Sequence, residues 1–368
     1  MTTPYPQQPG WVPVPRRTTP SVVAEVIGIS LGLLAALTVL GVIVSTTGGN
    51  VVVAGALAFI PLLGVLWAIR WIDRWEPEPR LTLVAAFLWG AGVSTLISLF
   101  FNTVTAQALS GTGASVIEQL AISSAVVAPM IEETTKGLGV LLVFLLRRRS
   151  FDGPVDGVVY AATVAVGFAF VENILYFTEY SDSVGALFVG RAIMSPFAHV
   201  IFTSMTGLAL GIASRQRSRA AWVGLFPVGL VLAMMLHGLW NFSSLSTRYV
   251  FLYFALQVPL FLTLTALVYW LRHQERTMLA RRLEDYARAG WFSAAEVGML
   301  TSLRERRRAM KWAASRGRGA AMKTFQRAAT EAAYLRERAA VGNAPATFAA
   351  DEAAYLNQTA TARAALYA

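Results

Sequence analysis

Two histidines and three glutamates lie inside long apolar stretches of the chain. They are His199, His237, Glu132, Glu133 and Glu172. Two imidazoles and one carboxylate can bind Zn²⁺ and leave an open position for water, while a further carboxylate serves as general base. A route without metal also fits, in which a glutamate takes a proton from water and a histidine assists. Both routes end with water attacking an amide bond, and no His-Glu-x-x-His pattern decides between them.

Helix spacing brings several of these groups onto shared faces. Glu132 and Lys136 are four residues apart, so they can pair along one helix, with Glu133 about 100° around it. His237 and Asn241 have the same spacing, and in the metal-free route they donate hydrogen bonds to the oxyanion. We therefore expect the catalytic residues to include Glu132, Glu133, Lys136 and Asn241.

The composition is that of an integral membrane protein. The chain has 368 residues, of which 55% are hydrophobic and only 14% are charged, whereas an average soluble domain has about 25% charged residues. Cysteine is absent, which excludes disulfides, thiolate catalysis, zinc ribbons and iron–sulfur clusters. Any metal must therefore be bound by nitrogen and oxygen atoms.

A bilayer core of about 30 Å needs roughly 20 apolar residues per helix, and eight stretches meet this need. They cover residues 22–44, 51–69, 81–101, 119–146, 154–177, 185–213, 220–245 and 250–271. We therefore predict an all-α, polytopic membrane protein with about eight transmembrane helices, which form a catalytic domain over residues 22–271. Residues 1–21 are predicted to be a disordered, proline-rich cytoplasmic arm, and residues 272–368 a basic, helical cytoplasmic tail.

The ionisable groups inside these spans need a reason to be there. Each costs about 2.5–3.5 kcal/mol at the middle of a membrane, which is where Glu132 and His199 fall when their spans are counted at 1.5 Å per residue. Such groups must face one another or water, so they mark a functional site. Glu25, near the end of the first span, is expected to extend to the interface instead. Polar side chains can also tie transmembrane helices together, and this role alone could account for each of three residues: Asn173, Arg191 and Asn241.

Charge predicts the orientation, because short loops rich in Lys and Arg stay in the cytoplasm. Alternate connections carry three arginines each, within residues 70–80, 147–149 and 215–219. The intervening loops at 45–50, 102–118 and 178–183 contain no Lys or Arg. Only Arg248 lies on the opposite side. We therefore predict a multi-pass protein of the plasma membrane with both termini in the cytoplasm.

The tail has the composition of soluble helices. It carries 17 Lys and Arg against 9 Asp and Glu, and the run from Ser293 to Glu296 has the pattern of a capping box that opens a helix. A basic surface for anionic lipid, or a docking segment, would explain the charge, but a solvated helical tail is the simpler interpretation. The chain shows no nucleic-acid recognition motif, so we expect no nucleic-acid partner.

Together the motifs resemble the PrsW family of bacterial intramembrane proteases, distant relatives of the CAAX-processing and bacteriocin-immunity membrane proteins. The resemblance covers residues 51–271. In chain order its pieces are Asp73-Arg-Trp-Glu-Pro-Glu-Pro79, Glu132-Glu-Thr-Thr-Lys136, Asp156-Gly-Val-Val-Tyr160, Phe168 to Glu172 (F-x-x-x-E), His199, and His237-Gly-Leu-Trp-Asn241. Four motifs in order on four successive spans make the resemblance specific.

The resemblance implies hydrolysis of peptide bonds inside the membrane. It assigns the general base and its partner to Glu132 and Glu133, and it gives Asn241 the task of supporting the oxyanion or orienting His237. The groups that bind a metal or polarise the water are, on this resemblance, Glu172, His199 and His237. The family is labelled a metalloprotease, while its CAAX relatives are similar to glutamate proteases. One divalent metal, Zn²⁺, and a metal-free mechanism therefore both stay open.

Two other classes of membrane protein bury similar groups. A proton-coupled transporter places Glu, Lys and His at the midplane, but it usually has inverted repeats, and residues 22–146 and 154–271 show no convincing repeat. A membrane haem protein could use His199 and His237 as axial ligands. Neither explains the adjacent Glu132 and Glu133 as well as hydrolysis does. The resemblance suggests membrane-anchored regulatory proteins, such as anti-sigma factors, as substrates.

Overall fold

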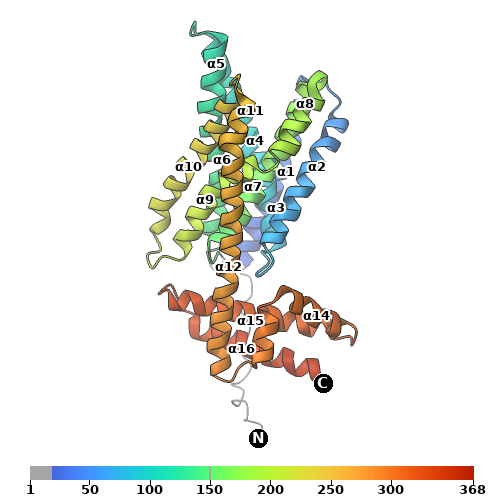
Figure 1. Cartoon of the computed structure of the whole chain (residues 1–368), viewed down its shortest axis with the longest axis vertical. Helices are drawn as coiled ribbons and strands as arrows, with labels where there is room; N and C mark the ends of the chain where they lie inside the picture. Colours follow the sequence, from blue (N-terminus) through green and yellow to red (C-terminus); the bar gives the residue numbers. More distant parts are fainter. Residues whose placement is uncertain (1–18, 149–150) are drawn as a thin grey trace.

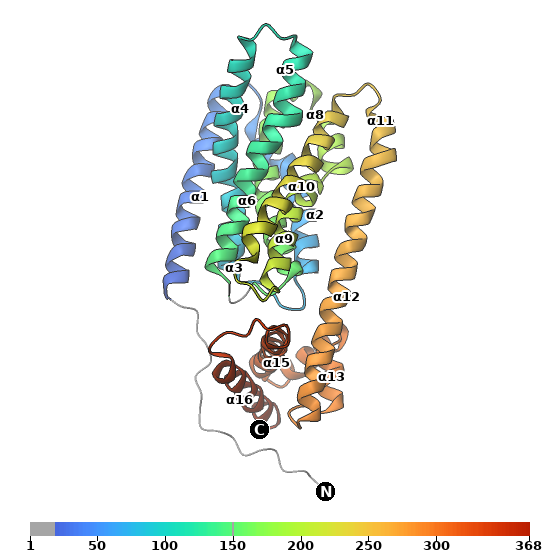
Figure 2. The same ribbon diagram turned by 90° about the vertical axis from the view of Figure 1, so that its left-hand side faces the viewer.

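The computed structural model describes residues 19–148 and 151–368. Within them the secondary structure is entirely helical. Figures 1 and 2 show a bundle of long, roughly parallel helices, with a second group of shorter helices beneath one end. The predicted arm at 1–21 lies outside the described residues up to position 18, and so does Arg149.

The first half of the bundle consists of α1 Thr19–Thr46, α2 Val51–Ile72, α3 Arg80–Leu88, η1 Trp89–Ser94, α4 Thr95–Ser110, α5 Val116–Ile122, η2 Ser123–Val127 and α6 Ala128–Leu146. The second half consists of α7 Pro154–Glu179, η3 Ser181–Ser183, α8 Val184–Phe188, η4 Val189–Met194, α9 Ala198–Ser214, α10 Ala221–Ser244, α11 Tyr249–Leu252, η5 Tyr253–Gln257 and α12 Val258–Arg288. The remaining helices are α13 Ala294–Leu300, α14 Leu303–Ala314, α15 Gly319–Ala340 and α16 Phe348–Tyr367.

Seven helical stretches in the described part of the chain are long and apolar enough to cross a membrane. They are Val22–Thr46, Val51–Ile72, Arg80–Ser110, Pro154–Glu179, Ser181–Ser214, Ala221–Ser244 and Tyr249–Arg288. The prediction of an all-α, polytopic membrane protein is therefore confirmed. The one remaining predicted span, residues 119–146, corresponds to α5, η2 and α6, which follow one another without a break. Within residues 119–146 it carries Glu132, Glu133 and Lys136, which sets it apart from the seven apolar stretches.

Small residues let α7 and α9 meet backbone to backbone. A Cβ atom on Gly157 would lie 2.0 Å from the carbonyl oxygen of Gly207, and a Cβ on Gly207 would lie 2.1 Å from that of Gly157. Only glycine permits this approach, so these two positions are points of close helix packing. Along α7 the contact continues in fully buried residues such as Ala161 and Ala165. Helix α7 is thus the centre of the bundle, and it holds Glu172 beside the helices that carry the histidines.

The predicted tail contains a hydrophobic core of its own. Helix α12 continues beyond the bundle to Arg288, and its Leu279 and Leu283 pack with Leu300 and Phe325 in a buried cluster. Trp75, from the loop between α2 and α3, belongs to the same cluster. The expectation of a merely solvated tail is therefore wrong, because α12–α16 bury apolar faces against one another. We call α13–α16 the C-terminal unit.

Glu25 is also placed differently from its prediction. It is only 6% exposed and forms an ion pair with Arg147 from the end of α6. The same carboxylate accepts a hydrogen bond of 2.5 Å from the hydroxyl of Thr82. Extension to the interface is therefore wrong for Glu25, because a cation on the neighbouring helix offsets the cost of burying its charge.

Candidate active site

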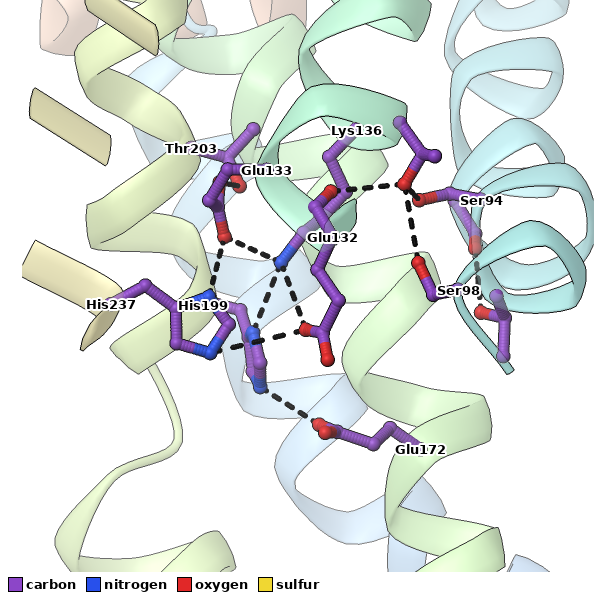
Figure 3. Close-up of polar contacts among 12 residues, drawn as sticks. Ser94, Ser98, Glu132, Glu133, Lys136, Glu172, His199, Thr203 and His237 are labelled. Atoms are coloured by element: carbon purple, nitrogen blue, oxygen red, sulfur yellow. Dashed lines mark hydrogen bonds and ion pairs between the residues drawn. The ribbon is translucent and has the colours of Figure 1, made fainter. Parts of the chain in front are cut away.

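The predicted polar residues meet inside the bundle, on four different helices (Figure 3). Helix α6 supplies Glu132, Glu133 and Lys136, while α9 and α10 each supply one histidine. Glu132 lies at the middle of the helical rod formed by residues 116–146, and His199 lies near the middle of the stretch 181–214. The packing of α6, α9 and α10 against one another therefore brings these groups together at depth in the bundle.

Glu133 and Lys136 form a fully buried ion pair. The Nζ atom of Lys136 is 2.6 Å from Oε1 of Glu133, and both side chains are 0% exposed. The hydroxyl of Thr203 donates a 2.8 Å hydrogen bond to the other carboxylate oxygen. The ammonium also lies 4.3 Å from the centre of the Phe168 ring. The carboxylate of Glu133 thus has a cation and a hydroxyl as partners, and the ammonium of Lys136 has a carboxylate and an aromatic face. These are the partners that burial of an ion pair requires.

His237 is held by Glu133. Its Nδ1 atom is 2.9 Å from Oε1 of that carboxylate, and because an ionised carboxylate only accepts, Nδ1 of the neutral ring donates its proton. The Nε2 atom then carries the lone pair, and it lies 3.9 Å from Oε2 of Glu132. The ring of Phe202 stacks on the imidazole at 5.0 Å between centroids. Both the tautomer and the ring plane of His237 are therefore set by its neighbours.

His199 is held in the same manner by Glu172. Its Nε2 atom is 2.8 Å from Oε2 of Glu172, so in the neutral ring Nδ1 carries the lone pair. That atom is 3.3 Å from Nζ of Lys136. Arg191 binds the same oxygen of Glu172 at 2.5 Å. His199 and Glu172 are each 14% exposed, which makes this the more open side of the site.

Glu132 has a buried oxygen atom without a hydrogen bond, although the ammonium of Lys136 lies 3.7 Å from it. Its Oε1 atom is 3.5 Å from the amide nitrogen of Asn102, whereas Oε2 is buried and has no hydrogen bond among the described residues. One ligand atom each from Glu132, His199 and His237 lies within 4.8 Å of the other two. Two nitrogens and one oxygen are a donor set that Zn²⁺ accepts. The orphaned oxygen and this convergence show that the residues fit a divalent metal.

Two predicted residues lie beside the convergent set. The family resemblance groups Glu172 with the histidines as a ligand, but the structure brings Glu132 to that position and engages Glu172 with Arg191 and His199. Asn241 shares a helix with His237, yet its amide donates a 2.7 Å hydrogen bond to the main-chain oxygen of Ser124. That bond ties α10 to η2, so the amide is turned away from the oxyanion role.

Several hydroxyl groups at the site are not among the residues predicted from the sequence. Thr135 lies 2.7 Å from the hydroxyl of Ser94 and 3.3 Å from that of Ser98, and its main-chain oxygen accepts a hydrogen bond from Trp89. These contacts fix the turn of α6 that follows Glu132. The spacing of Ser94 and Ser98, four residues apart in an apolar span, is the signal that could have predicted them.

The fold and the site together define a class of protein. A bundle of membrane-spanning helices that encloses carboxylates and imidazoles away from bulk solvent is the arrangement expected of an intramembrane hydrolase. The sequence model described as "PrsW family intramembrane metalloprotease" matches residues 78–265. The chain therefore belongs to the PrsW family, and it is an intramembrane endopeptidase.

Curated relatives named Protease PrsW agree with this assignment. The protein of Clostridioides difficile (strain 630) is 31% identical over 189 residues, which are 50% of this chain and 76% of the relative. That of Geobacillus kaustophilus (strain HTA426) is 27% identical over 177 residues, or 47% and 72% of the two chains. That of Bacillus subtilis (strain 168) is 30% identical over 172 residues, or 46% and 72%. No solved structure matches the chain.

The family assignment confirms the predicted class and favours proteolysis over the transporter alternative. The family's description as a metalloprotease agrees with the donor set of Glu132, His199 and His237. The match ends at residue 265, so the C-terminal unit lies outside it. The Asp73-Arg-Trp stretch lies just before residue 78, where the family match begins.

Proposed function

We propose that Glu132, His199 and His237 form the centre at which water attacks a peptide bond within the membrane. The observation that supports this most directly is the Oε2 atom of Glu132, which is buried without a hydrogen bond among the described residues and lies 3.9 Å from the lone-pair nitrogen of His237. A buried carboxylate oxygen without a hydrogen bond costs free energy in a folded protein. Such an atom is expected where the partner is a reactant or a metal.

In this proposal each residue around the centre has a separate task. In the route without a metal, Glu132 accepts the proton of the attacking water and later returns it to the leaving amine. Glu133 and Glu172 hold the two imidazoles in the orientation that points a lone pair inward. Lys136 offsets the negative charge of the adjacent glutamates. Asn241 has a positioning task, since its bond to Ser124 fixes the helix that carries His237.

A divalent metal would be held by Glu132, His199 and His237. When bound, Zn²⁺ lowers the pKa of its water and polarises the scissile carbonyl. The chain's own residues do the rest: Phe202 and Phe168 exclude bulk water from around the imidazole of His237 and the ammonium of Lys136, which strengthens the electrostatic interactions inside.

The proposed substrates are membrane-anchored proteins, with anti-sigma-factor-like regulators as the first class to test. The depth of the site supports membrane-anchored substrates, because a soluble peptide cannot reach the middle of a bilayer without the cost of burying its backbone. The proposed orientation has both termini in the cytoplasm, since alternate loops carry the arginines. The proposed domain organisation keeps a catalytic membrane domain at 22–271 and a cytoplasmic region from residue 272.

The test is comparative proteomics of membrane-protein fragments from cells that express the active chain or a His237→Ala variant. Fragments that depend on the active chain identify the substrate and the cleaved bond. His273→Ala is the matched control, because this histidine is exposed at the end of the last span and lies outside the site. The control should keep full cleavage, while His237→Ala should lose it. Near-normal cleavage by well-inserted His237→Ala protein would refute the assignment.

A further inference from the structure

The two histidines of the site are held by chains of contacts of the same design. For His237, the Oε1 atom of Glu133 binds Nδ1 at 2.9 Å and the ammonium of Lys136 at 2.6 Å. One carboxylate oxygen therefore contacts both an imidazole and a cation. The cation offsets the charge that the carboxylate would otherwise bury alone.

Arg191 occupies the equivalent place beside His199. The Oε2 atom of Glu172 binds Nε2 of His199 at 2.8 Å and Nη2 of Arg191 at 2.5 Å. Again a single oxygen contacts both an imidazole and a cation. Lys136 belongs to a motif of the sequence, whereas Arg191 belongs to none and is predicted from the sequence only as a contact between helices.

The position of the guanidinium is fixed from three sides. Its Nε atom donates a 2.6 Å hydrogen bond to Oδ1 of Asn173, and its central carbon lies 4.2 Å from the centre of the Tyr176 ring. With the contact to Glu172, these interactions hold the charge in one place on the surface of α7. A planar guanidinium keeps several donors in a fixed fork, so less orientation is lost per bond than with an ammonium.

The backbone around Arg191 is irregular. The residue lies in the π-helical segment η4, after which the helix breaks before α9 begins at Ala198. Two bonds close the break: the hydroxyl of Ser195 donates to the main-chain oxygen of Gly190, and that of Tyr253 donates to the main-chain oxygen of Met194. Short π-helical insertions are frequent at functional sites. Here the insertion directs the arginine side chain toward Glu172.

We propose that Arg191 is a positioning residue that holds Glu172 against His199 and so directs the lone pair of His199 into the reaction centre. The inference rests on the proposed function of that centre. Without the guanidinium, Glu172 would be a partly buried carboxylate whose remaining contact is with His199, and its side chain could turn toward the open side of the site. His199 would then lose the contact that sets its tautomer and its ring plane.

A purely structural use of Arg191 makes a different prediction. If the residue only ties η4 to α7, removing its bond to Asn173 should have the same effect as removing its bond to Glu172. The matched pair is therefore Arg191→Gln, which loses the charge at Glu172, and Asn173→Ala, which loses a helix–helix hydrogen bond and leaves the contact with Glu172 in place. Arg191→Lys keeps the charge with fewer donors.

The experiment titrates the purified full-length chain with Co²⁺ and follows the visible absorption of the bound ion. Loss of a group that supports a metal ligand typically weakens metal affinity by about 10–100-fold. We expect a loss of this size for Arg191→Gln and smaller losses for Arg191→Lys and Asn173→Ala, both of which leave a cation beside Glu172. Wild-type affinity in Arg191→Gln, or an equal loss in Asn173→Ala, overturns the inference.

A cleavage assay separates this inference from the proposed function. Arg191→Gln should lower kcat by at least about tenfold at nearly constant KM, and Arg191→Lys should restore part of it. If the wild type binds no Co²⁺, this kinetic pattern alone decides, and unchanged kcat in Arg191→Gln refutes the inference. A wild-type chain that neither binds Co²⁺ nor cleaves membrane proteins refutes the proposed function, and the role of Arg191 falls with it.

Discussion

Glu132 and Glu133 are adjacent in the sequence, but their replacement by glutamine is expected to fail for different reasons. Glu133 contacts Lys136 at 2.6 Å, His237 at 2.9 Å and Thr203 at 2.8 Å, and none of its side chain is exposed. Removing one partner of a buried ion pair typically costs about 3–5 kcal/mol. Glu133→Gln should therefore unfold at clearly lower temperature and accumulate poorly, in addition to losing activity.

Glu132→Gln should instead insert and fold normally. Its Oε2 atom has no hydrogen bond to lose, and the Nζ atom of Lys136 lies 3.7 Å from it. The contact of its Oε1 atom with Asn102 is long, at 3.5 Å. Even a typical polar contact between membrane helices is worth only about 0.6–1.7 kcal/mol. Loss of the general base, however, should lower the cleavage rate by about 10²–10⁴-fold.

The assay measures cleavage of a co-reconstituted membrane substrate per unit of folded protein, together with thermal unfolding of each variant in detergent. The expected result is a stable, inactive Glu132→Gln and an unstable Glu133→Gln. If Glu132→Gln unfolds as readily as Glu133→Gln, or cleaves at more than about a tenth of the wild-type rate, the assignment of Glu132 to the reaction centre is incorrect.

Further predictions concern the metal, the packing and the C-terminal unit. The purified chain should contain about one divalent ion, and chelation should stop cleavage reversibly; full activity in metal-free protein would instead favour the glutamate-base route. Gly157→Ala should disrupt the α7–α9 contact with Gly207 and reduce the amount of protein in the membrane, measured by immunoblot. Gly41→Ala, with open space around its Cβ position, should leave that amount unchanged. Trp75→Ala should destabilise the C-terminal unit by about 3–5 kcal/mol and speed its cleavage by trypsin. Burial and the nearby charge of Asp152 raise the pKa of Glu331 from 4.5 to about 7. The unit's stability should therefore fall as pH rises through this interval, since the unfolded chain releases the proton first, and Glu331→Gln should flatten the dependence of trypsin cleavage on pH.

The membrane fold followed from the sequence because it depends on properties that are local in the chain. Length and apolarity predicted each of the seven candidate spans. The core of the C-terminal unit did not follow. Its buried residues come from several short helices and from Trp75, which precedes α13 by more than 200 residues, and no local pattern joins them.

The candidate site shows the same division. Glu132, Lys136 and the histidines could be predicted because ionisable groups are rare in apolar spans. Which carboxylate faces which imidazole depends on the rotation of α6, α7 and α9 about their own axes, and sequence spacing does not fix that rotation between helices. The position of Glu132, rather than Glu172, in the group with His199 and His237 follows from that rotation. The error at Glu25 has a similar origin, since Arg147 becomes its neighbour only when the first and fourth predicted spans pack together.

Helix α12 runs without interruption from the bundle into the C-terminal unit, over 31 residues, or about 46 Å. Together with the insertion of Trp75 into the unit, it fastens the unit beneath one end of the bundle at two separate points (Figure 2). The unit therefore covers part of that end of the bundle, and a folded domain attached to a substrate on that side would need a tether long enough to pass it.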